Sequence, residues 1–421
     1  MLRREKNVAA AIANGGRRRE VVVAVRTKLL LNVGVDTSGD WLWRYFTLPK
    51  SESKVIGLID LSQALAALDD SSPGPEVIAV EVLPGSENKF PTSHSAVLSL
   101  SLLDDSSNLS RTLFIKKVTA AAMAHKPWAD RRRTLAYIRT EMRFYQEFAE
   151  ALASRAGVRI PRAGITRGRL EALGDSEVGD PAGEEPAQEV LRDCGAILLL
   201  ECAEGYEQMS PLPPRRAEAA LAAAARLHAA GWEQQELLQA AAGRLQRHGG
   251  SFALSIRNPK ELTKLRGNWA RFVDTFGPLA PELFARPSVL QLGDRLEAWS
   301  GWVAQQLSPG PEAACATIVH GDFKAMNVFL PPDSDDTRQA MLIDFASTGV
   351  GYGMADVAMH LSHSVAPADL ADGGEERLLD AYLQALEVAR GNEAAEYPRE
   401  LALRHYRLAV VDYGRFVVQL C

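Results

Sequence analysis

The chain has 421 residues, a formal net charge of −6 and 24% charged residues. A chain of this length can bury a sizeable core, and we expect two lobes rather than one compact unit. The acidic balance gives no reason to expect nucleic acid as a partner, and no apolar run approaches the length that spans a bilayer. The four cysteines are scattered without a C-x-x-C pair, which favours a reducing compartment over a disulfide framework.

The first fifty residues differ from the rest of the chain. Within the first thirty, eight lysines and arginines stand against two glutamates, and no serine occurs. An organellar transit peptide is also basic, but it is normally rich in serine and poor in acids. We therefore expect residues 1–50 to be a poorly ordered basic extension of a cytoplasmic protein, with organellar targeting as the alternative.

Two apolar segments predict the first strands. Residues 77–82 are followed by a breaker-rich run at 84–89 and by alternating apolar residues at 96–100. A strand, a small polar loop and a second strand can cover nucleotide phosphates with backbone amides. No GxGxxG motif is present here, so an ordinary hairpin turn explains the segment equally well.

A lysine pair lies in the next predicted strand, residues 113–118. Lys116 follows an apolar triplet, the general form of the phosphate-binding strand lysine of kinases, but successive side chains point to opposite faces. We favour Lys116 and keep Lys117 as the alternate. Residues 130–152 have apolar positions at helical spacing, with Glu141 among them. Because a buried carboxylate needs a partner, Glu141 is predicted to pair with the strand lysine, unless it is an exposed acid on a misassigned face.

A predicted strand at residues 196–201 runs into Cys202 and a small, flexible connector. In a two-lobed enzyme this segment would act as the hinge and offer backbone groups to adenine, which assigns Glu201 and Cys202 to the nucleotide site. The segment alone could equally be any core strand. Its position in the chain favours the hinge, so we expect an N-lobe over residues 51–203 and a C-lobe over residues 204–421.

The C-lobe is predicted to be mainly helical. An alanine-rich helix at residues 215–230 contains His228, which we expect to be a buried structural histidine that hydrogen-bonds to the backbone. Four tryptophans in this part do not decide what the lobe binds: Trp232, Trp269, Trp299 and Trp302.

The segment 318–327 is the most informative part of the sequence. A short apolar strand leads into His320, Asp322 and, five residues after the aspartate, Asn327. This is the spacing of a kinase catalytic loop. Phosphoryl transfer to an alcohol needs a carboxylate near the attacking hydroxyl and oxygen ligands for the magnesium on the nucleotide phosphates. Asp322 can meet the first need, and Asn327 with Asp344 can meet the second.

A predicted hairpin brings the two magnesium ligands together. Residues 328–330 and 341–343 are apolar runs separated by an acidic, proline-containing turn. If they pair antiparallel, Asn327 and Asp344 lie side by side where the hairpin opens. A solvated loop with ordinary capping residues is the alternative. Further on, Asp356 begins a predicted helix, where it either braces the catalytic loop through backbone amides or caps its own helix.

These residues together resemble the choline kinase and aminoglycoside phosphotransferase superfamily, closest to its ecdysteroid-kinase-like (CHK-type) branch. The resemblance covers residues 55–421, and it rests on the strand lysine, Glu141, the catalytic loop, the Ile343-Asp344-Phe345 triplet and Asp356. The glycine after His320 and the alanine after Phe345 depart from the protein-kinase pattern, and no Ala-Pro-Glu segment follows. A protein kinase is therefore disfavoured.

The resemblance implies an α+β, bilobal protein-kinase-like fold with an antiparallel N-lobe sheet, one long N-lobe helix and a helical C-lobe that carries the catalytic-loop hairpin. It also implies ATP, Mg²⁺ and a small-molecule alcohol as acceptor. Carried over by position, Asp322 would be the catalytic base within a catalytic loop that includes His320, and Asn327 and Asp344 would hold magnesium. Lys116 would bind the α and β phosphates, and Glu141 would fix that lysine. A nucleotide-binding scaffold without activity is the alternative.

Overall fold

The structure is a computed structural model that describes residues 58–70, 75, 77–89, 92–102, 109–257, 259–333, 338–391 and 396–419. The expectations for residues 1–50 lie outside the described residues. Within the described part, no helix has both the length and the apolar character needed to cross a membrane.

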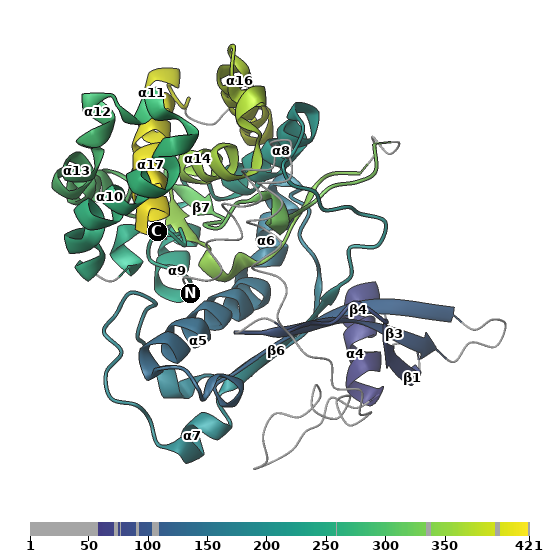
Figure 1. Ribbon diagram of the computed structural model, residues 1–421. Coiled ribbons are helices and arrows are strands. Elements are labelled where there is room, and N and C mark those ends of the chain that lie inside the picture. The colour runs from purple at the N-terminus through teal and green to yellow at the C-terminus, as the bar shows by residue number, and fades with distance from the viewer. Residues whose placement is uncertain are drawn as a thin grey trace, which may run out of the picture. The chain divides into compact units, whose positions relative to one another are not determined.

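A six-stranded antiparallel sheet forms the N-terminal part of the fold (Figure 1). Its strand order is β1-β3-β4-β6-β5, with the two-residue strand β2 paired to β3. The strands are β1 (Val77–Val82), β2 (Asn88–Lys89), β3 (His94–Leu102), β4 (Leu109–Thr119), β5 (Ala163–Arg169) and β6 (Gly195–Glu201). Strand β6, between β4 and the edge strand β5, is buried along nearly its whole length, as its apolar sequence predicts, and helix α4 (Leu58–Asp69) packs against β1 and β5.

One long helical segment crosses from this sheet toward the rest of the fold. It consists of α5 (Trp128–Arg143), a π-helical turn (Phe144–Phe148) and α6 (Ala149–Ala156). The helical period of the sequence predicted the segment at 130–152, but it could not predict the π-helical turn. The wider turn changes the direction of the side chains that follow it, and such turns are frequent at functional sites.

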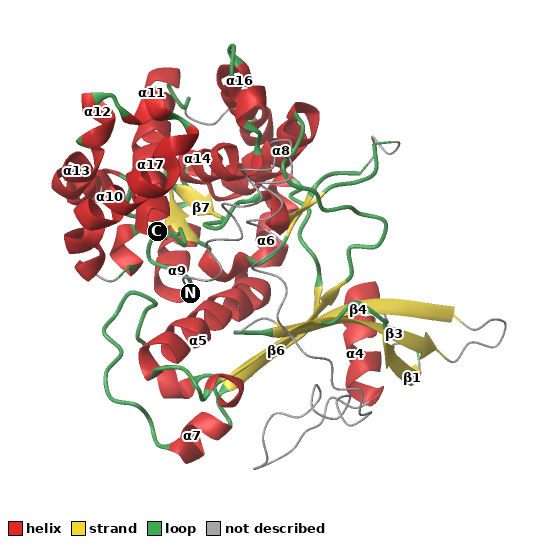
Figure 2. Cartoon of the chain, viewed as in Figure 1, coloured by secondary structure: helices red, strands yellow, loops and turns green. Residues whose placement is uncertain are grey.

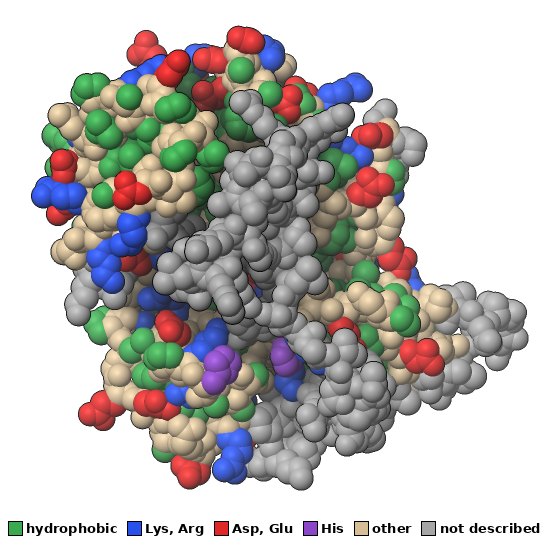
Figure 3. Space-filling view, viewed as in Figure 1, with side chains coloured by type: hydrophobic (Ala, Val, Ile, Leu, Met, Phe, Trp, Pro, Cys, Tyr) green, Lys and Arg blue, Asp and Glu red, His purple; other side chains and the backbone are tan. Residues whose placement is uncertain are grey.

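The C-terminal part is mainly helical (Figure 2). Its longer helices are α8 (Pro214–Gly231), α9 (Gln235–Arg244), α10 (Leu265–Phe276), α13 (Leu292–Gln306), α14 (Gly353–Ser364), α16 (Gly374–Arg390) and α17 (Arg399–Gln419). Short helices of this part are α11 (Pro281–Phe284), α12 (Pro287–Leu290) and α15 (Pro367–Leu370), whereas the short helix α7 (Gln188–Arg192) precedes β6. Helix α8 packs closely on α16, because its many alanines keep the contact surface flat. Acidic and basic side chains are interspersed on the face shown in Figure 3.

Two small antiparallel strand pairs flank the predicted catalytic loop and Asp344. Strand β7 (Thr317–Val319) pairs with β10 (Gly349–Gly351), and β8 (Val328–Phe329) pairs with β9 (Met341–Leu342). The second pair is the hairpin that the sequence predicted, although its strands are shorter than expected. Together the elements form the α+β, protein-kinase-like fold that the resemblance implied.

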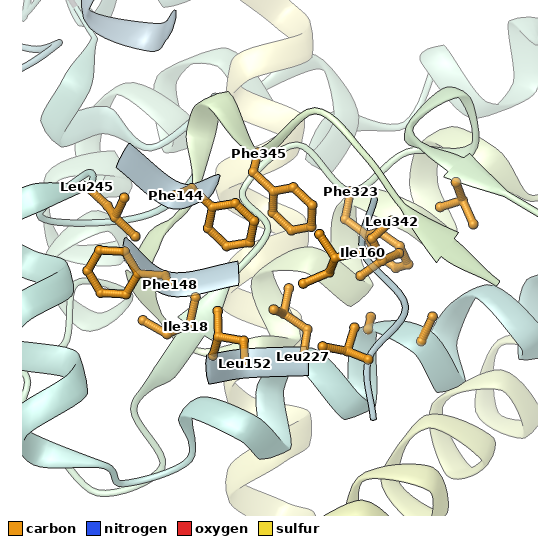
Figure 4. Packing of buried hydrophobic residues seen from close by; sticks show 14 of the residues in the cluster. Phe144, Phe148, Leu152, Ile160, Leu227, Leu245, Ile318, Phe323, Leu342 and Phe345 are labelled. Carbon is orange, nitrogen blue, oxygen red and sulfur yellow. The ribbon is translucent and has the colours of Figure 1, made fainter. Parts of the chain in front are cut away.

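A continuous hydrophobic core joins the long helical segment to the hairpin (Figure 4). Phe144, in the π-helical turn, stacks on Phe345 with ring centroids 3.9 Å apart and an interplanar angle of 11°. Both rings are fully buried. Since Phe345 directly follows Asp344, this stacking fixes the backbone from which the Asp344 carboxylate projects.

Candidate active site

The catalytic loop begins where β7 ends, and His320 fixes its course. The imidazole is fully buried, its Nε2 donates to the Ile343 carbonyl oxygen at 2.8 Å, and its Nδ1 accepts from the Asp322 backbone N–H at 3.3 Å. The ring therefore connects the loop to the hairpin. It is not among the described residues that line a cleft of about 580 Å³, to which Lys116, Glu141, Asp322 and Asp344 contribute. The buried ring thus holds the course of the loop, and a catalytic role for His320 itself stays a prediction.

Asp356 braces the same loop from helix α14. Its Oδ2 accepts from the His320 backbone N–H at 2.6 Å, and its Oδ1 accepts from the Gly321 N–H at 2.9 Å. Burial raises the pKa of Asp356, but the hydrogen bond and charge of His228 and the loop amide outweigh it and hold that pKa below its usual value. Of the two interpretations of Asp356, bracing is confirmed, since α14 has no side-chain cap.

His228 is buried as predicted, but its partners differ from the prediction. Its ring nitrogens contact the Tyr382 hydroxyl at 2.8 Å and the Asp356 carboxylate at 3.0 Å, rather than the backbone. The histidine thus orients the carboxylate that holds the loop.

Gly321 permits the close approach on which this bracing depends. Its φ of +81° is in the left-handed region, and a Cβ at this position would lie 2.1 Å from the Ser347 carbonyl oxygen. Any residue with a side chain would have to push the loop away from its neighbour.

Three polar neighbours hold the Asp322 carboxylate at the edge of the cleft. Ser251 Oγ donates to Oδ1 at 3.1 Å, Lys324 Nζ lies 2.8 Å from Oδ2, and Asn327 Nδ2 donates to Oδ2 at 3.1 Å. The carboxylate is 18% exposed, so it remains accessible to a ligand. The amide nitrogen of Asn327 is occupied by Asp322, which leaves its carbonyl Oδ1 for another partner.

The hairpin brings Asn327 and Asp344 together. The Ile343 N–H donates to the Asn327 carbonyl oxygen at 3.1 Å, so Asn327 lies opposite Ile343 and next to Asp344. Asp344 has a φ of +64°, an uncommon conformation for a residue with a side chain. This backbone conformation directs the Asp344 carboxylate toward Lys116 of strand β4.

Lys116 lies between two carboxylates. Its Nζ is 2.7 Å from Glu141 Oε2 and 2.9 Å from Asp344 Oδ1. Burial lowers the pKa of Lys116, but the charges of Asp344 and Glu141 outweigh it and raise that pKa overall. Burial raises the pKa of Glu141 to about 7, against the opposing effect of Lys116. Asp344 has a lowered pKa, because the Lys116 charge exceeds the opposing effect of burial.

Lys117 lies on the opposite face of β4. It is paired across the sheet with His94, whereas Lys116 lines a cleft of about 580 Å³ together with Glu141, Asp322 and Asp344. Alternation along a strand explains the difference, since neighbouring side chains cannot enter the same cleft.

A family model supplies the decisive comparison. The model of the phosphotransferase enzyme family (APH) matches residues 106–402. The chain belongs to this family.

The chain is also similar to solved structures of kinases and phosphotransferases. An aminoglycoside-3'-phosphotransferase of type VIII has 20% identity, covering 84% of this chain and 99% of that one, with a TM-score of 0.36. The choline kinase LicA from Streptococcus pneumoniae has 12% identity, covering 82% of this chain and 85% of that one, with a TM-score of 0.36. The amicoumacin kinase hAmiN, in complex with AMP-PNP, Ca²⁺ and Ami, has 13% identity, covering 81% of each chain, with a TM-score of 0.40. No curated protein matches the chain.

The two predicted hinge residues turn their side chains away from the cleft of Lys116. Glu201 and Cys202 line a second cavity of about 680 Å³, and the two cavities share none of their described lining residues. The Glu201 carboxylate is bound by the Arg159 guanidinium and by the Arg162 backbone N–H. Their side chains therefore do not contribute to the cleft of Lys116.

The sequence analysis did not identify two partners of Asp322, Lys324 and Ser251. Lys324 could have been noticed, because it stands two positions after the aspartate. Ser251 gave no signal, since it is 71 residues away in the chain. Of the tryptophans, none is among the described residues that line the cleft.

Proposed function

We propose that this phosphotransferase moves the γ-phosphate of ATP to a hydroxyl group of a small molecule in a magnesium-dependent reaction. One observation carries the proposal: Lys116, Glu141 and Asp344 converge in the cleft that also contains Asp322. Family membership supports the reaction class. The motif departures described above disfavour a protein kinase. From the resemblance we propose the ecdysteroid-kinase-like branch of the superfamily, with lobes at residues 51–203 and 204–421.

In the proposed reaction, Asp322 orients the acceptor hydroxyl and takes its proton. A bond forms between the acceptor oxygen and the γ-phosphorus while the bond from that phosphorus to the bridging oxygen breaks, and ADP leaves with the electron pair. Lys116 holds the α and β phosphates, and Glu141 keeps the lysine in place. The backbone near Cys202 would contact adenine. Catalysis then rests on positioning and charge neutralisation.

The residues present fit a magnesium site. The amide nitrogen of Asn327 donates to Asp322, so its Oδ1 is available to the ion. Asp344 contacts Lys116 through one carboxylate oxygen and has a second oxygen for the ion. Magnesium prefers a few such oxygen ligands and completes its shell with water and phosphate oxygens. When bound, the ion would neutralise charge on the phosphates. The described residues contain no cluster of three histidine, cysteine or acidic side chains, so ligands beyond these two would come from the nucleotide and water.

Nucleotide binding and transfer can be tested separately. Thermal unfolding with ATP should show a higher Tm when Mg²⁺ is present than when it is absent. Release of ADP should then increase with specific members of a library of small alcohols. An ATP-dependent rise in Tm without transfer to any alcohol would favour the nucleotide-binding scaffold. Absence of any nucleotide effect on Tm would contradict both functions.

The Glu141 carboxylate predicts a pH dependence. Since burial raises the pKa of Glu141 to about 7, the carboxyl gains a proton as the pH falls below about 7, and Lys116 then loses one of its two anionic partners. We expect kcat/KM to fall on the acid side of this pKa. In Glu141→Gln the side chain cannot titrate, so kcat/KM should be about 10–100-fold lower at pH 8 and should lose this acid limb. An unchanged acid limb in the variant would assign the titration to another group.

A further inference from the structure

Among the described residues, the wall of the cleft beyond Asp322 contains three aromatic side chains and an arginine. Tyr137 comes from α5, Tyr413 and Phe416 from α17, and Arg257 from the loop before α10. Burial, with a contribution from the Asp322 charge, raises the pKa of Tyr413 to about 12, which places this phenol in the field of the catalytic carboxylate. A ligand whose hydroxyl reaches Asp322 would therefore meet these rings.

Arg257 is held in a fixed orientation. Its Nε donates to Glu261 Oε2 at 3.1 Å, its Nη2 lies 2.9 Å from Glu261 Oε1, and its guanidinium carbon is 5.0 Å from the centre of the Phe416 ring. The side chain is 19% exposed. Among the described residues, Nη1 has no hydrogen-bond partner, so one donor edge remains for a ligand. A planar guanidinium fixed in this way is suited to binding a carboxylate.

The carboxylates that line the cleft are already paired. Asp322 is bound by Lys324, and Glu141 and Asp344 share Lys116. Glu261 is not among the described lining residues and is bound by Arg257. Of the charged side chains described in the lining, Arg257 alone belongs neither to the Lys116 group nor to the Asp322 pair. A cationic acceptor would thus meet an arginine and find no unpaired acid in the described wall.

We propose that the acceptor is an alcohol that carries a carboxylate on a flat, apolar body. This inference rests on the proposed phosphotransferase function. The carboxylate binds Arg257, the apolar body packs against Tyr413 and Phe416, and the hydroxyl reaches Asp322. Cationic alcohols, by contrast, are selected against by the same arginine.

Three probes of matched shape test the charge preference: 4-(hydroxymethyl)benzoate, 4-(hydroxymethyl)benzamide and 4-(hydroxymethyl)benzylamine. With the full-length protein, ATP and Mg²⁺, we expect kcat/KM for the carboxylate to exceed that for the amide about tenfold, and that for the amine by more, because a charge-assisted hydrogen bond has about that effect. Calorimetric dissociation constants, measured with a non-hydrolysable ATP analogue and Mg²⁺, should follow the same order.

Variants assign the preference to Arg257. Arg257→Gln should reduce the preference for the carboxylate about tenfold, mainly through KM. The double variant Arg257→Glu/Glu261→Arg keeps the ion pair but reverses the charge toward the cleft, and should favour the amine. The matched control is Arg399→Gln, since Arg399 pairs with Asp380 at 2.6 Å and does not line the cleft. It should leave the order of the probes unchanged.

The outcomes separate this inference from the proposed function. Tight binding of the carboxylate without phosphate transfer to any probe would contradict the proposed function and leave the binding preference intact. Equal or better binding and turnover of the amine would overturn the inference while the phosphotransferase function stands. Failure of all three probes to bind would also overturn it.

Discussion

Substitution of Asp322 by asparagine is expected to lower kcat by about 10²–10⁴-fold while nucleotide binding is retained. Asparagine has nearly the same shape and keeps one oxygen for Ser251, but it cannot take the proton of an acceptor hydroxyl. Its loss of charge also leaves Lys324 without an anionic partner at 2.8 Å. Steady-state ADP release with an accepted alcohol measures the loss, and the Tm shift with ATP and Mg²⁺ measures nucleotide binding.

A matched variant controls for the loss of an acid as such. Asp274 is an exposed aspartate on α10, and Asp274→Asn should leave kcat within about twofold of the original value. If Asp322→Asn retained full turnover, the assignment of the base would be wrong. A variant that lost nucleotide binding together with turnover would instead indicate a structural role for the carboxylate.

Asp356→Ala is expected to lower the free energy of unfolding by about 3–5 kcal/mol, the range for removal of one partner of a buried charged network. The carboxylate is 1% exposed and accepts the backbone N–H groups of His320 and Gly321 together with a contact from His228. Alanine would leave these donors buried without an acceptor, which is more costly than the loss of a surface bond. Chemical denaturation, followed by circular dichroism, measures the change.

The control for this prediction is Asp274→Ala, which should change the free energy of unfolding by no more than about 0.5 kcal/mol. Residual activity adds a second readout. If the folded fraction of Asp356→Ala turns over with an unchanged kcat, the bracing contributes to stability but not to the position of Asp322. A stability loss below about 1 kcal/mol would show that water replaces the carboxylate, contrary to the expectation.

The local part of the candidate site was readable from the sequence. Asp322 and Asn327 are close in the chain, and a short hairpin places Asp344 beside them, so spacing and turn residues were sufficient to expect their convergence. The apolar helix face predicted a partner for Glu141 by the cost of burying a lone carboxylate. The family match then supported the reaction class, although the individual roles remain proposals.

Other features required the packed structure. The motif marks His320, but only the packed structure shows that its ring is buried and bonded to the Ile343 carbonyl oxygen. The hinge prediction concerned the backbone at the end of the strand 196–201, and only the fold shows that the Glu201 side chain turns to Arg159. Which face of a strand or connector meets a cleft depends on what packs against it.

What the residues determined by themselves was therefore the short-range arrangement of Asp322, Asn327 and Asp344, whereas the class of fold followed from the family resemblance. Periodicity and turn chemistry act over a few residues, and they are written directly in the order of the amino acids. Tertiary structure alone decided that Lys116 enters the cleft, that Ser251 binds Asp322 and that Arg257 faces the proposed acceptor. These contacts join segments far apart in the chain, and such partners are fixed only when the sheet and the helices pack together.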